Sequence, residues 1–300
     1  RHSKKVATIS RGTKTEKFEF IGRYKEISSV TKLCKHLSVS RSGYYEWSHR
    51  EKSKHALYDK KLMVNIRRIF NQSRETYGSP RVHRKLKLMG VSVGKKRVAR
   101  LMRQAKLVAK ISRTYPRKPK TRARFQISEN LRLKDKTTHS INTHWSSDIT
   151  YLTFGKRWLY LAIVMDLHSR KVVGWSVGAS KTTALVKRAL KLAVKKRKPA
   201  PGLILHSDRG SEYGSVELKS YTDQNSIVRS MSRSYTSIDN AEVESFFQKF
   251  KGEFMIGKTF NSLKQLQRLI AQYVNGFYNS TRIHSSLNYL SPVQYEAIQG

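Results

Sequence analysis

The sequence predicts an α/β domain in its second half, preceded by a basic all-α domain. Two observations support this division. Residues 1–140 hold 39 Lys and Arg against 9 Asp and Glu, whereas residues 141–300 hold 22 against 11. The first part also has apolar residues at helical spacing, and strand-like runs begin at Trp145. A chain of 300 residues has room for two or three domains, so each part can build a core.

The overall composition favours a folded protein that binds an anionic polymer. The chain has 61 Lys and Arg against 20 Asp and Glu, a formal charge of +41, yet 38% of its residues are hydrophobic. A charge of this size repels itself unless nucleic acid neutralises it, so nucleic acid is the expected partner. The single cysteine, Cys34, excludes a disulfide scaffold and a zinc site built from cysteines. No apolar run approaches the roughly 18 residues that span a bilayer, so we expect a cytoplasmic, nucleoid-associated protein without a membrane partner.

Four segments are expected along the chain. They are a basic N-terminal arm (residues 1–24), a helical DNA-binding domain (25–110), a basic linker (111–137) and the α/β domain (138–300). The linker is predicted from two prolines, weak periodicity and many cations, and we expect it to lie along DNA.

The densest basic stretch predicts phosphate contacts. Residues 81–120 contain 15 basic residues and no acidic one, whereas a merely solvated helix face, the alternative, normally mixes signs. Cations that touch phosphate carry no base information, so this stretch does not tell which helix reads bases. The candidate DNA contacts here and in the linker are Arg81, Arg84, Lys85, Lys95, Lys96, Arg97, Arg100, Arg103, Arg117, Lys118, Lys120, Arg122 and Arg124.

Short helices account for the first domain. Residues 29–50 read as two helices around a polar turn at 38–40, which fits a helix-turn-helix motif and equally an ordinary helical hairpin. We expect Cys34 to be a small core residue there. Further helices are predicted over residues 59–70, from an N-cap at Ser79 to a stop at Gly90, and from Lys95 onward. In the last of these Val98, Leu101, Met102 and Leu107 should point inward and the cations outward.

The second domain reads as a meander of three antiparallel strands followed by alternating helices and strands. The predicted strands cover residues 148–154, 158–167 and 171–177, then 203–205 and 227–228. Helices are predicted over residues 181–196, between the two short strands, from Asp239 to about Phe254, and over 262–279. This order describes an RNase H-like α/β fold.

Three carboxylates stand out in this acid-poor chain. Asp148 lies within a strand, where Asp is disfavoured, and Asp208 lies where a buried strand gives way to a loop, a usual place for catalytic groups. Glu244 lies one turn into a helix, beside an apolar seam of Val243, Phe247, Phe250 and Phe254. Converging carboxylates can hold two Mg²⁺ ions, with Mn²⁺ as the expected substitute, for phosphodiester chemistry.

Each carboxylate also has a structural interpretation. Asp148 suits an edge strand, Asp208 a turn, and Glu244 the N-terminal end of a helix dipole. Three such coincidences in one acid-poor fold are less expected than one metal site. Asp166, beside a turn, is interpreted as structural, and Asp239 with Asn240 as the helix start. Glu242 points away from Glu244 by about 160° on an ideal helix, so it is the weaker metal ligand.

Long ordered motifs resemble the DDE integrase core of bacterial insertion-sequence transposases, the large family with two reading frames joined by frameshifting. They include WSSDITY from Trp145, MDLHSRKVVGWSVG from Met165, HSDRGSEY from His206 and SMSRSYTSIDNAEVESFFQKFKGE from Ser230. The closing YNSTRIHSSLNYLSP at 278–292 also fits, and in the first domain SVSRSGYYEWSHR and YGSPRVHRKL resemble the segment that precedes this core. The resemblance covers residues from about 25 to the C-terminus.

The resemblance implies roles for individual residues. Asp148, Asp208 and Glu244 would be the catalytic and metal-binding residues, and Lys251 would contact DNA near the cleaved end. Arg282 and His284 match a C-terminal motif, which would give Arg282 a DNA contact; capping and packing on the last helix is an equal alternative. Glu212 stands where relatives commonly carry Gln, and it would either perturb Asp208 or lie in solvent.

The resemblance also implies an activity. A metal-dependent DNA transposase would cleave the inverted-repeat ends of its element and join the freed 3′-OH to target DNA, acting as a homodimer on double-stranded DNA. The resemblance also implies a further DNA-binding and oligomerisation segment encoded upstream, and the sequence does not tell whether such a segment is required. A DNA-binding regulator without catalysis and an RNase H-like nuclease are the alternatives.

Overall fold

A computed structural model describes residues 12–49, 53–110, 128–131, 140–233 and 240–299. The chain divides into two compact units, residues 1–64 and 65–300. Most of the predicted linker, with Arg117, Lys118, Lys120, Arg122 and Arg124, lies outside the described residues, as does the predicted helix start at Asp239. The predicted boundaries at residues 24, 110 and 137 stay predictions.

Short helices packed around aromatic residues form the first unit. They are α2 (Lys14–Tyr24), α3 (Val30–His36), α4 (Arg41–His49) and the first part of α5 (Lys54–Gln72). The two predicted helices around residues 38–40 are confirmed as α3 and α4. Their core contains Cys34, which is 3% exposed, as expected, together with Phe18, Phe20, Ile21, Leu37 and Tyr44.

The second unit begins with the end of α5, followed by α6 (Ser79–Leu88) and α7 (Lys95–Gln104). The predicted N-cap at Ser79 is wrong by one residue. Gly78 is extended and its carbonyl accepts the first helical bond from Val82, so Ser79 is already helical. Gly90 adopts φ of 76° two residues after α6, which confirms it as the stop signal. On α7, Val98, Leu101 and Met102 are buried as predicted, whereas Leu107 lies beyond the helix and is half-buried.

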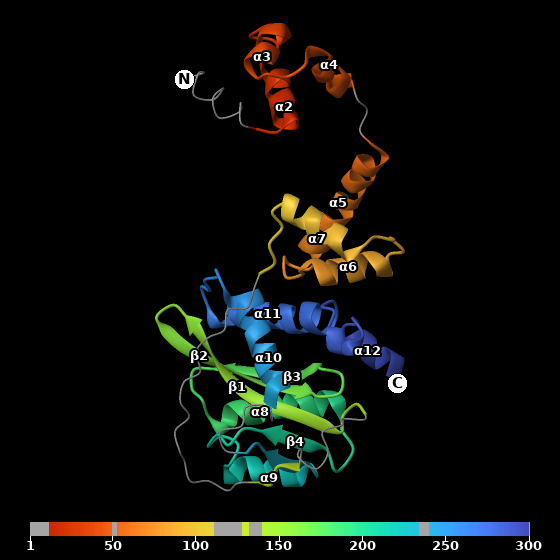
Figure 1. Cartoon of the computed structure of the whole chain (residues 1–300). Coiled ribbons are helices and arrows are strands. Elements are labelled where there is room, and N and C mark those ends of the chain that lie inside the picture. Colours follow the sequence, from red (N-terminus) through yellow and green to blue (C-terminus); the bar gives the residue numbers. More distant parts are fainter. Residues whose placement is uncertain (1–11, 50–52, 111–127, 132–139, 234–239, 300) are drawn as a thin grey trace. The chain divides into compact units, whose positions relative to one another are not determined.

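The central sheet has five strands, seen in Figure 1: β1 (His144–Phe154), β2 (Arg157–Asp166), β3 (Val172–Gly178), β4 (Ile204–Ser207) and β5 (Val228–Met231). Their order across the sheet is β3-β2-β1-β4-β5. The first three strands pair antiparallel, as the predicted meander requires, and β4 and β5 add in parallel beside β1. The predicted RNase H-like fold is therefore confirmed, and β1 is the middle strand.

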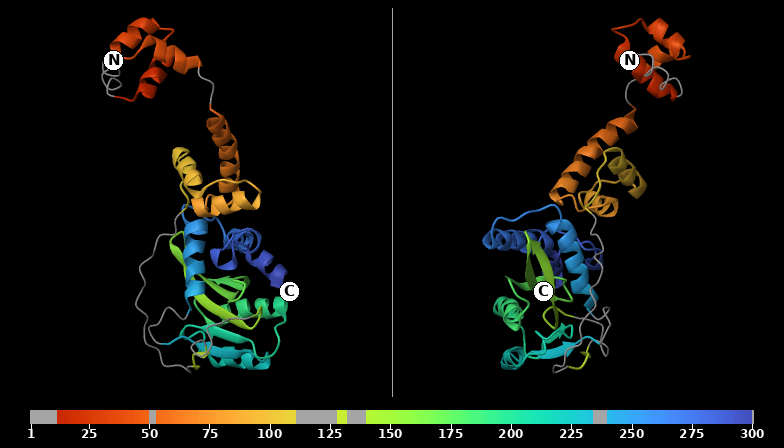
Figure 2. Two further views of the ribbon diagram at one scale, coloured as in Figure 1. Left: turned by 45° about the vertical axis from the view of Figure 1, so that its right-hand side comes forward. Right: turned by 90° about the vertical axis from the view of Figure 1, so that its left-hand side faces the viewer.

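Helices cover both faces of this sheet (Figure 2). Side chains of α8 (Thr183–Arg197) and α9 (Val216–Gln224) share one buried cluster with β1, β2 and β3. The other face carries α10 (Ala241–Phe250), continued by the π-helical segment η3 (Lys251–Met255), and α11 (Leu263–Ala271), continued by the π-helical segment η4 (Gln272–Asn279). The predicted helices in the second unit thus all exist.

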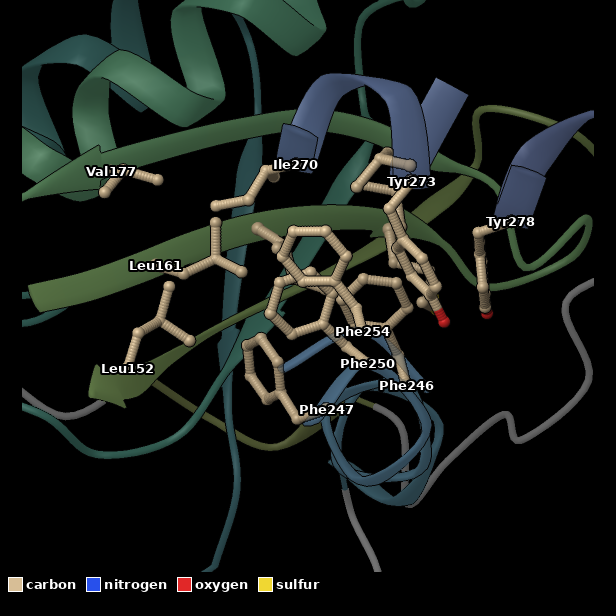
Figure 3. Close-up of a cluster of buried hydrophobic side chains, with 14 of the residues drawn as sticks. Leu152, Leu161, Val177, Phe246, Phe247, Phe250, Phe254, Ile270, Tyr273 and Tyr278 are labelled. Carbon is tan, nitrogen blue, oxygen red and sulfur yellow. The ribbon is translucent and has the colours of Figure 1, made fainter. Parts of the chain in front are cut away.

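Aromatic residues dominate the second cluster. The predicted seam of α10 is buried against the sheet and η4, and Phe246, which the spacing argument left out, is also fully buried (Figure 3). The Phe246 ring meets the Tyr278 ring edge-on at 4.7 Å between centroids. Burial of a Phe side chain stabilises the fold by about 1.5–3 kcal/mol, so this seam fixes α10 firmly on β1.

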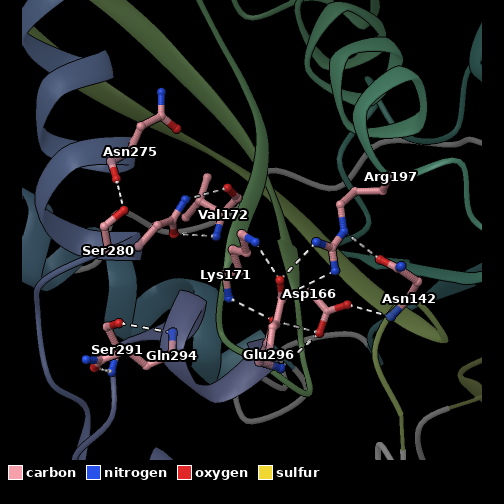
Figure 4. A network of polar contacts seen from close by, with 12 residues as sticks. Asn142, Asp166, Lys171, Val172, Arg197, Asn275, Ser280, Ser291, Gln294 and Glu296 are labelled. Atoms are coloured by element: carbon pink, nitrogen blue, oxygen red, sulfur yellow. Dashed lines mark hydrogen bonds and ion pairs between the residues drawn. The ribbon is translucent and has the colours of Figure 1, made fainter. Parts of the chain in front are cut away.

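A last helix, α12 (Pro292–Gln299), is not predicted from the sequence. Polar contacts fix it to the sheet edge (Figure 4). Glu296 accepts hydrogen bonds from Arg197 at 2.8 and 3.0 Å and also pairs with Lys171. Burial opposes the charge of Glu296, but the hydrogen bonds from Arg197, Lys171 and Ser169 hold its pKa below the ordinary value. No helix among the described residues has the length and apolar character needed to cross a membrane.

Candidate active site

Asp148 and Asp208 lie where the pairing of β1 with β4 ends. Strands β1 and β4 run parallel, and their last paired residues are Ser147 and Ser207. Asp148 is the next residue of β1, and Asp208 directly follows the last residue of β4. Neighbouring strands are about 4.8 Å apart, so the sheet register alone brings these carboxylates together. Both side chains are half-buried.

Contacts at both ends hold α10 and its continuation against β1. At its start, Asn240 Oδ1 accepts a hydrogen bond from the Ser146 hydroxyl, and just beyond its end Lys251 Nζ lies 3.8 Å from the centre of the Tyr151 ring. Glu244 follows Asn240 by four residues, about 6 Å along an ideal helix. Asp148 follows Ser146 by two residues, about 6.6 Å along an ideal strand. These ideal rises predict a position for Glu244 near the level of Asp148 on the neighbouring element.

The three carboxylates suit Mg²⁺ by their chemistry, since this ion prefers oxygen ligands and takes only one or two carboxylates with several waters. All three are half-buried and stay partly open to solvent. Among the described residues, however, no three Asp, Glu, His or Cys side chains already lie close enough to hold a metal ion. The described residues therefore show no finished ligand cage, and the metal-binding role of the three carboxylates stays a prediction.

Tyr213 lies beside the two aspartates, a position that the sequence argument did not identify. Its hydroxyl is 3.0 Å from the Ser147 hydroxyl, one residue before Asp148, and its side chain is buried. Burial raises the pKa of Tyr213 well above its ordinary value, and the charges of Asp148 and Asp208 raise it further. Tyr213 thus stays protonated and can act only as a neutral hydrogen-bonding group. In the sequence, the only indication of a role for Tyr213 at this site is its position at the end of the motif HSDRGSEY.

The loop after β4 positions the Asp208 carboxylate. The Gly210 amide donates a hydrogen bond to Asp208 Oδ1 at 3.0 Å. A Cβ atom on Gly210 would lie 3.0 Å from that oxygen and 2.5 Å from Glu212 Oε2, so a larger residue here would displace the Glu212 side chain. The amide of Tyr213 returns to the Gly210 carbonyl at 3.0 Å and closes the turn.

The expectation that Glu212 lies in solvent is wrong. Its side chain is 6% exposed because Oε1 pairs with Lys181 Nζ at 3.2 Å. Its Oε2 is buried without a hydrogen-bond partner in the described part of the chain. The shared proximity to Gly210 places this oxygen near Asp208 Oδ1.

Lys251 lies at the same end of the sheet. Burial lowers its pKa, while the nearby charge of Asp148 acts to raise it. The residue opens the π-helical segment η3, and single π turns within helices often mark functional positions. Lys251 is thus close enough to Asp148 to interact electrostatically with it.

Two other acidic residues have structural partners. Asp166 is fully buried and accepts hydrogen bonds from the amides of Asn142, His168 and Ser169. Glu242 pairs with Arg170 at 3.1 Å. The structural interpretation of Asp166 and the weaker claim of Glu242 on a metal agree with these contacts.

Known proteins resemble this chain over most of its length. Models described as Integrase core domain match residues 138–237 and 244–299, and one described as HTH-like domain matches residues 57–115. Transposase InsF for insertion sequence IS3A from Escherichia coli (strain K12) is 35% identical over 282 residues, 93% of this chain and 98% of that protein. The insertion element IS600 uncharacterized 31 kDa protein from Shigella sonnei is 34% identical over 263 residues, 88% of this chain and 97% of that protein. This chain belongs to the IS3 family of insertion-sequence transposases.

Solved structures give more distant likenesses to this transposase. The simian T-cell lymphotropic virus intasome in complex with PP2A regulatory subunit B56 gamma gives a TM-score of 0.44 at 16% identity, covering 70% of this chain and 69% of that one. The HTLV-2 integrase catalytic core domain in complex with magnesium gives 0.41 at 15% identity, covering 53% and 99%. Membership of the family and the HTH-like match make this transposase an enzyme that binds DNA.

The expected DNA contact of Arg282 is wrong. Its side chain is 1% exposed and donates two hydrogen bonds from Nε and one from Nη2 to the Glu253 carboxylate, at 2.6–3.1 Å. Burial alone would lower the pKa of Arg282, but the hydrogen bonds to Glu253 and its negative charge raise that pKa above its ordinary value. A guanidinium enclosed in this way cannot reach a phosphate, so Arg282 is a packing residue of the transposase core.

The remaining basic candidates differ in exposure. On α6, Arg81 and Arg84 are half-buried over the rings of Tyr77 and Tyr289, at 5.7 and 5.5 Å, and Lys85 is half-buried too. On α7, Arg97 is half-buried, whereas the exposed cations are Lys95, Lys96, Arg100 and Arg103. Their roles on DNA stay predictions, and α7 offers the more accessible basic surface for phosphate.

Proposed function

We propose that this transposase cleaves the ends of its insertion sequence and joins the freed 3′-OH to DNA at a centre formed by Asp148, Asp208 and Glu244. The observation that carries the proposal is that the pairing of β1 with β4 ends at the two aspartates, while contacts on either side of Glu244 hold α10 against β1. Their oxygens would hold two Mg²⁺ ions, with Mn²⁺ as a substitute. When bound, such ions activate the attacking oxygen and stabilise the leaving oxygen of a phosphodiester.

The protein groups around this centre have distinct tasks. The Gly210 amide orients Asp208, and the bond between Asn240 and Ser146 orients Glu244 relative to Asp148. Lys251 supplies a cation beside Asp148 that can bind a DNA phosphate near the cleaved end. In the first step water attacks the phosphodiester at the element end and the 3′ oxygen leaves. In the second step that 3′-OH attacks a phosphodiester of another strand and forms the new bond to its phosphorus. The 3′ oxygen of the attacked strand leaves.

The partners follow from the task. Double-stranded DNA would be bound at the inverted-repeat ends and at the target, with the exposed cations of α7 contacting phosphates. Joining two ends requires two active sites, so we propose a homodimer on DNA. Such a protein works at the nucleoid in the cytoplasm.

The decisive experiment compares the wild type with Glu244→Gln on labelled DNA carrying the element's own ends. Cleavage and joining in Mg²⁺ are followed on gels, and end binding by gel shift. The matched control is Glu242→Gln, two residues away on α10 and paired with Arg170. The proposal expects Glu244→Gln to bind ends but to lose joining, and Glu242→Gln to keep both.

Each other result identifies an alternative. Joining by Glu244→Gln would remove Glu244 from the centre. Cutting by the wild type without joining would indicate a nuclease on this fold. Binding without any chemistry, even with an upstream segment supplied, would indicate a DNA-binding regulator.

A further inference from the structure

We infer that helix α4 of the first unit reads base edges in the major groove of duplex DNA through its outer face. The inference rests on the proposed function, because it assumes that the transposase binds specific DNA ends. The HTH-like match begins at residue 57, so helices α2–α4 lie outside it. This unit would therefore be a second DNA-binding element of the chain.

The connection between α3 and α4 is a closed turn. Ser38 adopts φ of 51°, and its amide donates to the Lys35 carbonyl at 3.2 Å, while the Val39 amide donates to the Cys34 carbonyl at 3.0 Å. These bonds form a Schellman motif with serine in the left-handed position usually held by glycine. Two short helices joined by such a tight turn are the framework of a helix-turn-helix.

Helix α4 begins at once after this turn. The Ser40 hydroxyl accepts a hydrogen bond from the Gly43 amide at 3.2 Å, and the Ser40 carbonyl accepts one from the Tyr44 amide at 3.0 Å. Ser40 is thus the N-cap of the helix. The closed turn after α3 and the Ser40 cap together fix the direction in which α4 leaves α3.

One face of α4 is packed against α2. Tyr44 is 4% exposed and its ring lies 6.0 Å from the Phe18 ring. A Cβ atom at Gly43 would lie 3.4 Å from the Phe18 ring, at ordinary van der Waals distance, so this side of α4 lies directly against α2. The outer side of α4 runs from Arg41, about 60° from Tyr44 on an ideal helix, to His49, about 140° from it, and it is exposed.

That outer face is polar, aromatic and basic. Arg41, Tyr45 and His49, spaced four residues apart, are all exposed. The Arg41 guanidinium lies 5.7 Å from the Tyr45 ring centre, and His49 Nδ1 lies 2.8 Å from the Tyr45 carbonyl. Ordered side chains lose less conformational entropy on binding than mobile ones.

The chemistry of this face favours DNA over a protein partner. Arg41 at the first turn can make two hydrogen bonds to O6 and N7 of guanine, and Ser42 beside it can bond to any base edge. Exposed Lys32 and Lys35 on α3 add cations for the flanking phosphates. Helix α4 itself has one Arg and one Glu, so the excess positive charge beside its N-terminal end comes from Lys32 and Lys35 of α3. Recognition helices dock in this way, with their N-terminal residues at the bases.

The test measures discrimination rather than binding alone. The full chain is titrated with duplexes carrying its own element end and with scrambled duplexes of equal composition, at one salt concentration. Arg41→Lys keeps the positive charge but cannot form the paired contact to guanine. We expect Arg41→Lys and Tyr45→Ala each to lower the ratio of the two affinities by about tenfold to a hundredfold, leaving binding to scrambled DNA almost unchanged.

Arg23→Ala is the matched control, because Arg23 is an exposed arginine of the same unit on α2. It should leave the ratio at the wild-type value, and thermal unfolding verifies that all three variants are folded. A wild-type ratio in Arg41→Lys and Tyr45→Ala would overturn the inference while leaving the transposase function intact. An equal loss of affinity for the element-end duplex and for the scrambled duplex would also overturn the inference, since it would indicate contact with phosphates only. A wild type without any preference would refute specific end binding and the inference together.

Discussion

Asn240 and Ser146 are joined by a buried side-chain hydrogen bond that ties the start of α10 to the middle strand of the sheet. Asn240 precedes Glu244 by one helical turn, and Ser146 precedes Asp148 by two residues on the same strand. The bond therefore sets the position of one proposed metal-binding carboxylate relative to another. Neither of its two residues carries a charge or touches the reacting groups.

Asn240→Ala should impair chemistry without impairing DNA binding. Loss of the bond lets α10 shift along β1, and a displacement of about 1 Å at a catalytic group costs about a hundredfold in rate. We expect the single-turnover rate of strand joining to fall about tenfold to a hundredfold, with gel-shift affinity for element ends unchanged. Asn225→Ala, at the end of α9, is the control. An unchanged joining rate would show that Phe246 and its neighbours alone fix the helix.

The sequence predicts the helices and strands that carry this site better than it predicts the side-chain contacts between them. Asp148, Asp208 and Glu244 can be placed on two strands and a helix because hydrophobic periodicity identifies those elements. The partner of Asn240 could not be predicted, since an Asn at a helix start normally caps its own helix, and here its side chain bonds a distant strand instead. Glu212 was misjudged for a similar reason, because its partner Lys181 lies 31 residues away in sequence.

Removal of two cations from α7 should flatten the salt dependence of DNA binding. Lys95 and Lys96 are exposed at the start of this helix. Each phosphate contact contributes about 0.9 to the slope of log K against log salt concentration. Lys95→Ala with Lys96→Ala should therefore reduce the slope by about 1.8, measured by fluorescence anisotropy over a salt series.

A matched pair controls for net charge. Lys195 and Lys196 are likewise exposed, at the end of α8. Their replacement by Ala removes the same charge from another surface and should leave the slope near its wild-type value. Equal slopes for the two double variants would mean that α7 does not contact phosphate.

Removal of either partner of the Arg282–Glu253 pair should strongly destabilise the second unit. Both side chains are almost fully buried, at 1% and 6% exposed, and they lie as close as 2.6 Å. A buried charge that loses its partner costs about 3–5 kcal/mol. Glu253→Gln should lower the free energy of unfolding by about that amount in urea titrations followed by tryptophan fluorescence.

The exposed Lys187–Glu217 pair gives the comparison. Glu217 is 53% exposed, so Glu217→Gln should cost no more than about 1 kcal/mol. If Glu253→Gln lowered the free energy of unfolding by no more than Glu217→Gln does, water would have to reach Arg282. The resemblance implied a DNA contact for Arg282 with packing as an equal alternative, and its buried partner, 29 residues earlier, favours packing.

His284 should make the second unit less stable as the pH falls below 6.5. Burial, together with the charges of Arg282, Lys249 and Arg81, lowers the pKa of His284 to about 2. Between these pH values the unfolded chain binds a proton at this residue that the folded chain does not. The free energy of unfolding therefore falls with decreasing pH, by up to about 1.4 kcal/mol per unit from this group alone.

The difference between variants isolates this contribution. His284→Gln should show a shallower decline of stability between pH 6.5 and 5 than the wild type in urea titrations. His49→Gln, which changes an exposed histidine of the first unit, should keep the wild-type slope for the second unit. Identical slopes for the wild type and His284→Gln would mean that His284 is protonated in the folded state.

Tyr151 should matter for strand joining because it positions Lys251. The ammonium group lies 3.8 Å from the ring centre, and a cation over an aromatic face gains about 0.5–2 kcal/mol. Tyr151→Leu removes this attraction, so Lys251 loses its fixed place beside Asp148, and single-turnover joining should fall about twofold to thirtyfold. Tyr151→Phe keeps the ring face and should join strands at nearly the wild-type rate. If Tyr151→Phe were as slow as Tyr151→Leu, the hydroxyl and not the ring would be the group that counts.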